Sequence, residues 1–337
     1  MNCALIKMKN FKQAIFDNEK LFLSKYASFS CATQGRQKAS SPCPIRTEYA
    51  RDRDRIIHSK SFRRLKHKTQ VFLSPEGDHY RTRLTHTLEV SQIARSISRA
   101  LKLNEDLTEG IALGHDLGHT PYGHTGEEVL NEFINFNHNE QSLRIVDVLE
   151  NSGQGMNLTK EVRDGILNHR LGLETITLEG KVVSWSDKIA YISHDIDDII
   201  RAGFLKESDI PSEFAKILGK GHTKRINTMI LDIITNSIDK PFVALSDTMQ
   251  KALLGLREYL FVKFYNSPDI KAEEGKAKDM IRFLFEYYKK NMRLIPKYIL
   301  DLDASDEQKV CDYISTFTDR YCVRVFKEIT LPKNWQL

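Results

Sequence analysis

The chain has 337 residues, of which 41% are hydrophobic and 28% are charged. This composition is typical of a globular protein and excludes a chain that is mainly disordered or of low complexity. The net charge of +5, from 50 basic and 45 acidic residues, is too small to indicate nucleic-acid binding by itself.

Cysteine usage and hydropathy indicate the cellular compartment of the protein. The five cysteines are widely spread and form no CxxC pair, which is typical of a reducing cytoplasm rather than of a disulfide framework or a zinc ribbon. No stretch approaches the roughly 18 apolar residues of a transmembrane helix. Residues 1–11 lack the apolar core and cleavage site of a signal peptide. We therefore expect a cytoplasmic protein without a membrane anchor.

Apolar residues recur at three- and four-residue spacing along most of the chain, which predicts an all-α fold. In chain order, helices are expected at 84–103, 127–136, 141–149, 160–169, 182–200, 225–238, 242–265, 276–294 and 307–329. One small β-hairpin is expected at 173–183, where a Thr-Ile-Thr run precedes the turn-like Glu179-Gly180. Loop-rich stretches at 28–46 and 208–221 predict three parts. These are an N-terminal arm and linker (1–46), a core (47–205) and a helical C-terminal part packed on the core (206–337).

The segment from 114 to 124 is the richest in chemistry, with three histidines and an aspartate in eleven residues. The apolar run Ile111-Ala112-Leu113 before it indicates that a buried helix delivers His115 and Asp116. Adjacent helical residues lie about 100° apart, so both side chains can reach one ion at the helix edge. We interpret the segment as a metal site; the alternative is a satisfied polar core.

Two other helices offer further ligands. His86 lies at the head of the amphipathic helix 84–103, and Asp187 lies in the helix 182–200. Asp187, Tyr191 and either His194 or Asp195 share one face of that helix by their spacing. Two imidazoles and two carboxylates suit Mn²⁺, Fe²⁺, Co²⁺ or Mg²⁺ rather than a thiolate-type zinc site. The isolated histidines are not expected to be ligands; these are His58, His67, His79, His169 and His222.

The ordered set His86, His115-Asp116 and Asp187 resembles the H…HD…D signature of the HD superfamily of metal-dependent phosphohydrolases. Flanking motifs resemble its deoxyguanosine triphosphate triphosphohydrolase branch. They lie at 51–59, 62–65, 68–72, 81–86, 138–144, 312–314 and 318–321. The resemblance runs from about residue 47 to about residue 325 and implies an all-α HD-domain fold with additional C-terminal helices.

The resemblance implies a role for each matching residue. The implied metal ligands are His86, His115, Asp116 and Asp187. The implied catalytic residues are the pair His124 and Glu127, with His119 and His138 beside the phosphates.

Five further residues would bind the substrate. Gln70 would recognise the 3′-hydroxyl of a deoxyribose, and Asp195 would also bond the sugar. Tyr191 would stack on the sugar and exclude a 2′-hydroxyl. Arg83 and Lys188 would bind phosphate oxygens.

The implied reaction is hydrolysis of a deoxynucleoside triphosphate (dNTP) at the α-phosphorus to a deoxynucleoside and intact tripolyphosphate, which controls dNTP pools. One divalent ion (Mn, Mg, Fe, Co or Ni) would serve each active site. The family also implies a homo-oligomer, a tetramer or a hexamer. An activating nucleotide at a second site and a single-stranded DNA effector belong to the same expectation.

Several alternatives stay open at the level of sequence. Glu127, three residues after His124, fits a group that orients a catalytic histidine. Alternatively, Thr125 and Glu128 form a helix capping box and Glu127 only interacts with the helix dipole. Which of the three histidines is acid or base is undetermined. The alternative functions are another HD-type nucleotide phosphohydrolase or phosphodiesterase, and a nucleotide- or nucleic-acid-binding regulator, for which the basic stretch 51–68 could serve.

Overall fold

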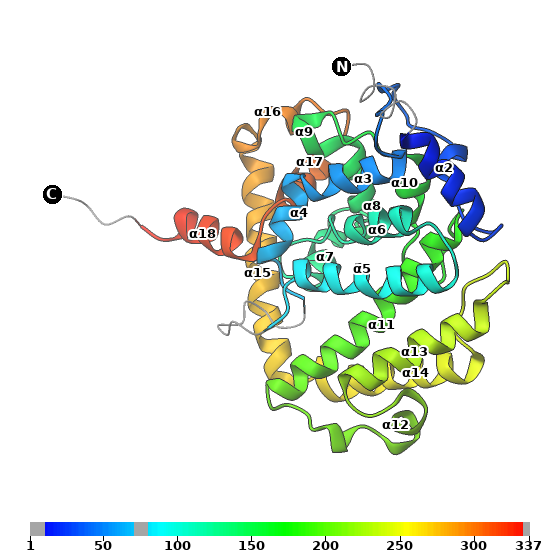
Figure 1. Ribbon diagram of the computed structural model, residues 1–337. Helices are drawn as coiled ribbons and strands as arrows, with labels where there is room; N and C mark the ends of the chain where they lie inside the picture. Colours follow the sequence, from blue (N-terminus) through cyan, green and yellow to red (C-terminus); the bar gives the residue numbers. More distant parts are fainter. Residues whose placement is uncertain (1–10, 71–79, 333–337) are drawn as a thin grey trace. The chain divides into compact units, whose positions relative to one another are not determined.

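The computed structural model describes residues 11–70 and 80–332, so Val71 and Phe72 of the 68–72 motif lie outside the described residues. Within the described ranges the only β pairings are the isolated bridges Arg36–Thr159 and Thr69–Thr82. The predicted all-α fold is therefore confirmed (Figure 1). No helix in the part of the chain that is described has the length and hydropathy needed to cross a membrane.

The chain divides into two compact units, each assembled from three separate segments. Unit 1 comprises Met1–His58, His86–His115 and Met156–Leu260. Unit 2 comprises Ser59–Thr85, Asp116–Gly155 and Phe261–Leu337. The two units are interleaved along the chain, and the predicted boundaries after residues 46 and 205 stay predictions.

Unit 1 is built around the buried helix α6 (Glu105–Gly114), which packs against three helices of the same unit, α3, α10 and α11. The other helices that lie wholly in unit 1 are α2 (Phe11–Phe22), α3 (Glu48–Ile57), α10 (Lys160–Leu167), α11 (Leu178–Arg201), α12 (Ser212–Leu218), α13 (His222–Ser237) and α14 (Asp247–Leu260). Helix α5 (Arg83–Ala100) begins in unit 2 and continues in unit 1 from His86.

Local sequence explains where α6 begins and how tightly it packs. The side chain of Asn104 caps the helix by accepting a hydrogen bond from the backbone N–H of Leu107 at 3.1 Å. Leu107 and Ile111 are fully buried, and each such burial stabilises the fold by about 2 kcal/mol. At Gly114 an added Cβ would lie 2.5 Å from the side chain of Ile166. The missing side chain lets the end of α6, and with it His115, approach α10 closely.

Unit 2 is organised by the long helix α15 (Pro268–Lys290), which packs against α7, α17 and α18. Its hydrophobic core includes Phe285, which is fully buried and stacks on Phe133 at 3.6 Å between ring centroids. The helices of unit 2 are α4 (Lys60–Arg64), α7 (His124–Asn131), α8 (His138–Arg144), α9 (Glu150–Gly153), α15, α16 (Lys297–Leu300), α17 (Asp306–Ser315) and α18 (Asp319–Thr330). Two π-helical turns, Ile145–Leu149 and Phe261–Tyr265, belong to the same unit.

The predicted β-hairpin at 173–183 is wrong, because α11 already begins at Leu178. Thr177 is the N-cap of this helix, and its side chain accepts a hydrogen bond from the N–H of Gly180 at 3.1 Å. The buried carboxylate of Glu179 accepts the backbone N–H groups of Asn104 and Ser28, both at 2.9 Å. The threonine that suggested a strand therefore starts a helix instead.

Two other expectations differ in detail. The stretch 208–221, expected to be a loop, contains the two-turn helix α12. The single helix expected at 307–329 is two helices, α17 and α18, because Thr318 leaves the helical conformation and caps α18 by accepting the N–H of Tyr321 at 3.2 Å. This break brings Asp319 to the first turn of a new helix.

Candidate active site

Three side chains predicted as metal ligands lie together in unit 1. His86 is in the first turn of α5, His115 directly follows α6, and Asp187 lies in α11. Oδ1 of Asp187 is 3.1 Å from Nε2 of His86 and 3.7 Å from Nε2 of His115. One donor atom from each of the three residues lies within 4.8 Å of the other two. Segments far apart in the sequence thus bring two imidazoles and a carboxylate to one point.

An imidazole can bind a metal ion only through a ring nitrogen that carries no proton, so the tautomer of each histidine matters. Nδ1 of His115 lies 2.6 Å from the carbonyl oxygen of Ala112, and because a carbonyl only accepts, Nδ1 carries the proton. Nε2 of His115 then presents its lone pair, as in metal-bound histidines whose other nitrogen donates to a carbonyl. Both histidines are buried, whereas the Asp187 side chain is 27% exposed. The donor set therefore fits a divalent ion that solvent or a ligand reaches from the Asp187 side.

Two further histidines of unit 1 adjoin the triangle, and sequence reasoning missed one of them entirely. The buried ring of His169 lies 5.1 Å from that of His115 between centroids, and its Nδ1 donates to the carbonyl of Ile166 at 2.7 Å. His194 lies 6.0 Å from His86, and its Nδ1 is 3.2 Å from Oε2 of Glu89. The signal for His194 was its position seven residues after Asp187, whereas nothing in the sequence marked His169.

The substrate-binding residues expected on α11 lie on adjoining turns. Nζ of Lys188 is 5.2 Å from the centre of the Tyr191 ring, and Asp195 is buried one turn further on. Burial is the largest effect on Lys188 and lowers its pKa, against the opposing charge of Asp187. The helix thus presents an amine, an aromatic ring and a carboxylate in succession from Asp187.

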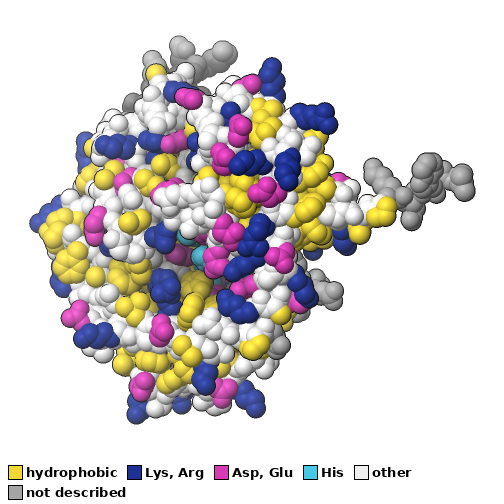
Figure 2. All heavy atoms as spheres, turned by 180° about the vertical axis from the view of Figure 1, so that it is seen from behind, with side chains coloured by type: hydrophobic (Ala, Val, Ile, Leu, Met, Phe, Trp, Pro, Cys, Tyr) yellow, Lys and Arg dark blue, Asp and Glu magenta, His cyan; other side chains and the backbone are white. Residues whose placement is uncertain are grey.

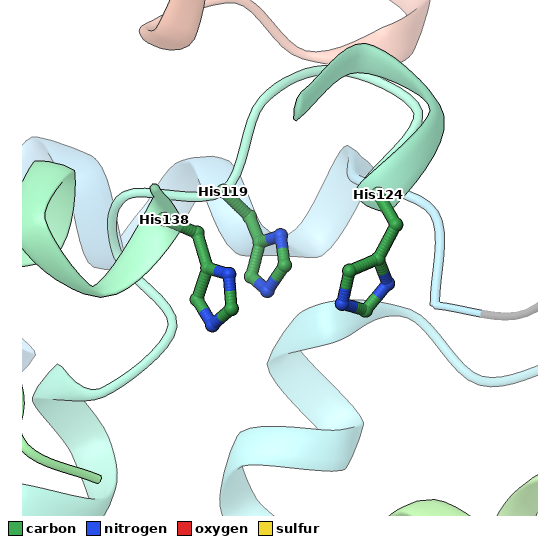
Figure 3. A group of neighbouring side chains, drawn as sticks. All are labelled: His119, His124 and His138. Atoms are coloured by element: carbon green, nitrogen blue, oxygen red, sulfur yellow. The ribbon is translucent and has the colours of Figure 1, made fainter. Parts of the chain in front are cut away.

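Three histidines gather in unit 2. His119 lies in the loop after α6, His124 is the first residue of α7, and His138 is the first residue of α8 (Figure 3). The rings of His119 and His138 stack at 4.1 Å between centroids with 12° between their planes. The ring of His124 lies edge-on to both, at 5.1 Å and 5.8 Å. This arrangement offers several ring nitrogens to a single bound group.

Glu127 bonds to His138 and not to His124, the partner that the sequence suggested. Its two carboxylate oxygens lie 2.9 and 3.0 Å from Nδ1 of His138, and one of them also accepts the backbone N–H of His138 at 3.0 Å. The first N–H groups of α8 have no partner within the helix, which favours a carboxylate there. The alternative with Thr125 as N-cap is wrong, because α7 begins at His124 and Gly123 is the N-cap.

Asp116, the fourth predicted ligand, belongs to unit 2 and pairs there with Arg83 and His119. Nη1 of Arg83 donates to Oδ2 of Asp116 at 2.9 Å, and Oδ1 of Asp116 lies 3.2 Å from Nε2 of His119. Arg83 is buried, and its Nε and Nη2 have no hydrogen-bond partner among the described residues. A buried guanidinium with unused donors suits phosphate oxygens.

Two nearby residues of unit 2 complete this region. Gly123 has φ +58°, and a Cβ there would lie 2.6 Å from Nη2 of Arg83, so only glycine leaves room for the guanidinium. Gln70 is half-buried, and its Oε1 is buried with no hydrogen-bond partner within residues 11–70 and 80–332. Gln70 thus holds an acceptor that a ligand hydroxyl can satisfy.

Burial and charge set the ionisation of the cluster. Burial, followed by the positive charge of Arg83, lowers the pKa of His119 well below its usual value. Loss of water around the ring, followed by the positive charge of Arg83, also lowers the pKa of His124. Because the residue as a whole is exposed, solvent screens part of this shift. Burial alone would raise the pKa of Glu127, but the hydrogen bonds from His138 outweigh it and lower that pKa to about 2. His119 and His124 are therefore neutral, and Glu127 is ionised, at neutral pH.

The depressed pKa of Glu127 predicts a pH-dependent contribution to stability. The folded-state pKa of about 2 lies below the ordinary glutamate value near 4.3, so the contribution is full above about pH 4.5 and is lost as the pH falls toward 2. We expect Glu127→Gln to lower the free energy of unfolding by about 2 kcal/mol at about pH 6 and by much less at about pH 3. Urea unfolding of both proteins across this range measures the difference.

Glu128 provides the matched control for this prediction. It lies on the same helix and pairs with Lys278 at the surface, with its own side chain 61% exposed. Glu128→Gln should change the free energy of unfolding by less than about 0.5 kcal/mol. A Glu127→Gln deficit that stayed constant from neutral to acid pH would contradict the assignment of the shifted pKa to this carboxylate.

The chain is similar to known proteins over most of its length. Residues 83–192 match the model of the HD domain, and residues 243–328 match that of the phosphohydrolase-associated domain. A protein of Caldanaerobacter subterraneus subsp. tengcongensis is 57% identical over 94% of this chain and 95% of its own length. One of Clostridium perfringens (strain SM101 / Type A) is 48% identical over 96% and 98%, and one of Desulfatibacillum aliphaticivorans is 47% identical over 94% and 97%. All three are named deoxyguanosinetriphosphate triphosphohydrolase-like protein.

Proposed function

The chain belongs to the deoxyguanosinetriphosphate triphosphohydrolase-like family of HD-domain phosphohydrolases, and we propose that it hydrolyses dNTPs to deoxynucleosides and tripolyphosphate in a metal-dependent reaction. The observation that carries the proposal is the convergence of His86, His115 and Asp187 on one point in unit 1. The membership supports a hydrolase acting on nucleotides, and the side chains support the finer assignment.

The proposed metal ligands are the three side chains of the triangle and Asp116, which follows His115 in the chain. When bound, a divalent ion supplies polarisation of the α-phosphoryl group and stabilisation of its developing charge. The chain's own part is to hold the imidazole of His115 in the tautomer that a metal ligand needs. The contact of His115 with the carbonyl of Ala112 supports this role.

Proton transfer is proposed for the histidine cluster. Neutral His119 and His124 can accept a proton from water at cytoplasmic pH. His138 donates its Nδ1–H to Glu127 and so presents Nε2 in a fixed direction, as the oriented member of a catalytic dyad does. One member of the cluster would protonate the leaving 5′-oxygen.

Five residues are proposed to bind and select the substrate. Nε and Nη2 of Arg83, which have no partner within the described ranges, would bind the triphosphate oxygens together with Lys188. The acceptor of Gln70 would take the 3′-hydroxyl, and Asp195 would bond the sugar. The Tyr191 ring, held beside Lys188, would leave no room for a 2′-hydroxyl.

A substrate panel tests the proposal. With Mn²⁺, we expect dGTP or several dNTPs to yield deoxynucleoside and tripolyphosphate, separated by ion-exchange chromatography. GTP should be hydrolysed with a kcat/KM lower by at least about 100-fold, and Tyr191→Ala should narrow that gap. A chelator should stop turnover. Release of orthophosphate or a monophosphate would place the protein with another kind of HD phosphohydrolase.

The regulatory alternative predicts salt-dependent binding of nucleic acid without turnover. On the face shown in Figure 2, basic and acidic side chains are intermixed and the basic ones form no continuous field. A homo-oligomer, an activating nucleotide, a single-stranded DNA effector and a cytoplasmic location stay predictions.

A further inference from the structure

Asp319 has no role in the proposed chemistry, yet its buried carboxylate reaches two segments that carry proposed active-site residues. It lies in the first turn of α18 and is 3% exposed. Oδ1 accepts the backbone N–H of Tyr122 at 2.9 Å. Oδ2 accepts the backbone N–H of Thr69 at 2.7 Å and also the hydroxyl of Thr69. All three residues belong to unit 2.

Tyr122 needs this support because its backbone is strained. Its φ is +61°, in the left-handed region that bulky residues rarely adopt. Tyr122 lies between His119 and His124, and the N–H that Asp319 accepts fixes the direction of the turn joining these two histidines. Burial raises the pKa of Asp319, and the hydrogen bonds from Thr69 and from the N–H of Tyr122 act against this shift by favouring the carboxylate form.

Thr69 is the residue before Gln70. The hydrogen bonds that its backbone N–H and hydroxyl donate to Asp319 therefore help to fix the position of the Gln70 backbone. The same segment is tied from its other side, because the carbonyl of Lys68 accepts the N–H of Arg83 at 3.2 Å. Nζ of Lys68 donates to the carbonyl of His119 and, at 2.8 Å, to that of Ser315 at the end of α17. These bonds connect Gln70, Arg83 and His119 to α17 and α18.

We infer that Asp319 is a positioning residue, which holds the Tyr122 turn and the Thr69–Gln70 segment in the arrangement that the reaction requires. The part of the phosphohydrolase-associated segment that lies in unit 2 contains Asp319 and would then support the histidine cluster as well as extend the core of that unit. This inference rests on the proposed function for its kinetic consequences, but its contacts can be tested without activity.

Asp319→Asn tests the contacts first. The amide of the asparagine has one oxygen and can accept only one of the two backbone N–H groups. The other N–H then faces the NH₂ group of the amide, which cannot accept it. Hydrogen exchange followed by mass spectrometry should show at least about 10-fold faster exchange in peptides covering 65–70 and 119–124. Peptides from α15 should be unchanged.

Kinetics test the positioning role. In Asp319→Asn we expect kcat to fall about 10- to 100-fold, because small displacements of reacting groups have effects of this size. The preference for a dNTP over the matching 2′,3′-dideoxynucleoside triphosphate should shrink as Gln70 loses its place. Bound metal, measured by elemental analysis, should stay at the wild-type level. General destabilisation would not change the preference between the two substrates.

Glu179→Gln is the matched control. Glu179 is also a buried carboxylate that accepts two backbone N–H groups, from Ser28 and Asn104 in unit 1. Its substitution should leave kcat and the sugar preference within about twofold of wild type. If Asp319→Asn does not fold, Thr69→Val removes only the hydroxyl donor and should reduce the sugar preference by a smaller factor.

The outcomes separate the two claims. A wild-type protein that turns over no dNTP overturns the proposed function, and the exchange data then still decide whether Asp319 holds both segments. With an active wild type, faster exchange in Asp319→Asn without loss of kcat or sugar preference overturns the positioning role. Unchanged exchange in both peptides overturns it as well.

Discussion

Asp187→Ala should abolish metal binding and lower kcat/KM by about three orders of magnitude, which corresponds to about 4 kcal/mol of transition-state stabilisation. Asp187 is the one carboxylate in the triangle of unit 1, with Oδ1 within 3.1 Å of His86 and 3.7 Å of His115. Its removal leaves His86, His115 and Asp116 as the proposed ligands, and a set with a single carboxylate binds Mn²⁺ or Mg²⁺ weakly because these ions prefer oxygen ligands. Elemental analysis of dialysed protein and steady-state kinetics measure the two effects.

Asp197→Ala on the same helix is the control for this substitution. Asp197 pairs with Arg201 at 3.1 Å in an i, i+4 arrangement on the solvent side of α11. The variant should keep wild-type metal content and activity, since an exposed pair of this kind contributes less than about 1 kcal/mol. Full metal content together with full activity in Asp187→Ala would show that the triangle is not the metal site.

Glu127→Gln and His138→Ala should each lower kcat by about 100-fold or more, and the double variant should be no worse than the poorer single variant. The carboxylate of Glu127 acts on the reaction through His138, to which it bonds at 2.9 Å, so loss of either residue disables the same unit. Kinetics of the two single variants and the double variant form a cycle that measures this coupling.

A second cycle, between Glu127 and His124, distinguishes the structural pairing from the one suggested by sequence spacing. The described residues show no hydrogen bond between these two side chains, so the effects of Glu127→Gln and His124→Ala should multiply. The opposite result would be independent effects of Glu127→Gln and His138→Ala, together with strong coupling between Glu127→Gln and His124→Ala. It would show that Glu127 acts through His124, as the sequence spacing suggested.

The part of this site that sequence could predict rests on helical periodicity and on short motifs. The spacing of Asp187, Tyr191 and Asp195 placed them on one face of a helix, and α11 runs without a break through all three. The apolar run before His115 predicted that a buried helix delivers it, and α6 is such a helix. Both inferences depend only on local sequence, which explains their success.

The features that the sequence did not predict depend on contacts between different segments of the chain. The hairpin expectation failed because Thr177 caps a helix whose first turn is stabilised by the contact of Glu179 with Asn104 and Ser28, which no local pattern reveals. Glu127 bonds to a histidine eleven residues away because the start of α8 offers it free N–H groups. His169 approaches His115 only because α6 and α10 pack closely in unit 1.

We expect water to attack the α-phosphorus of a dNTP and to leave the triphosphate chain intact. Hydrolysis of dGTP in ¹⁸O-labelled water, followed by mass spectrometry of the products, tests it most directly. One ¹⁸O atom should appear in tripolyphosphate and none in deoxyguanosine, since the P–O5′ bond breaks. Label in orthophosphate, pyrophosphate or the nucleoside would contradict it.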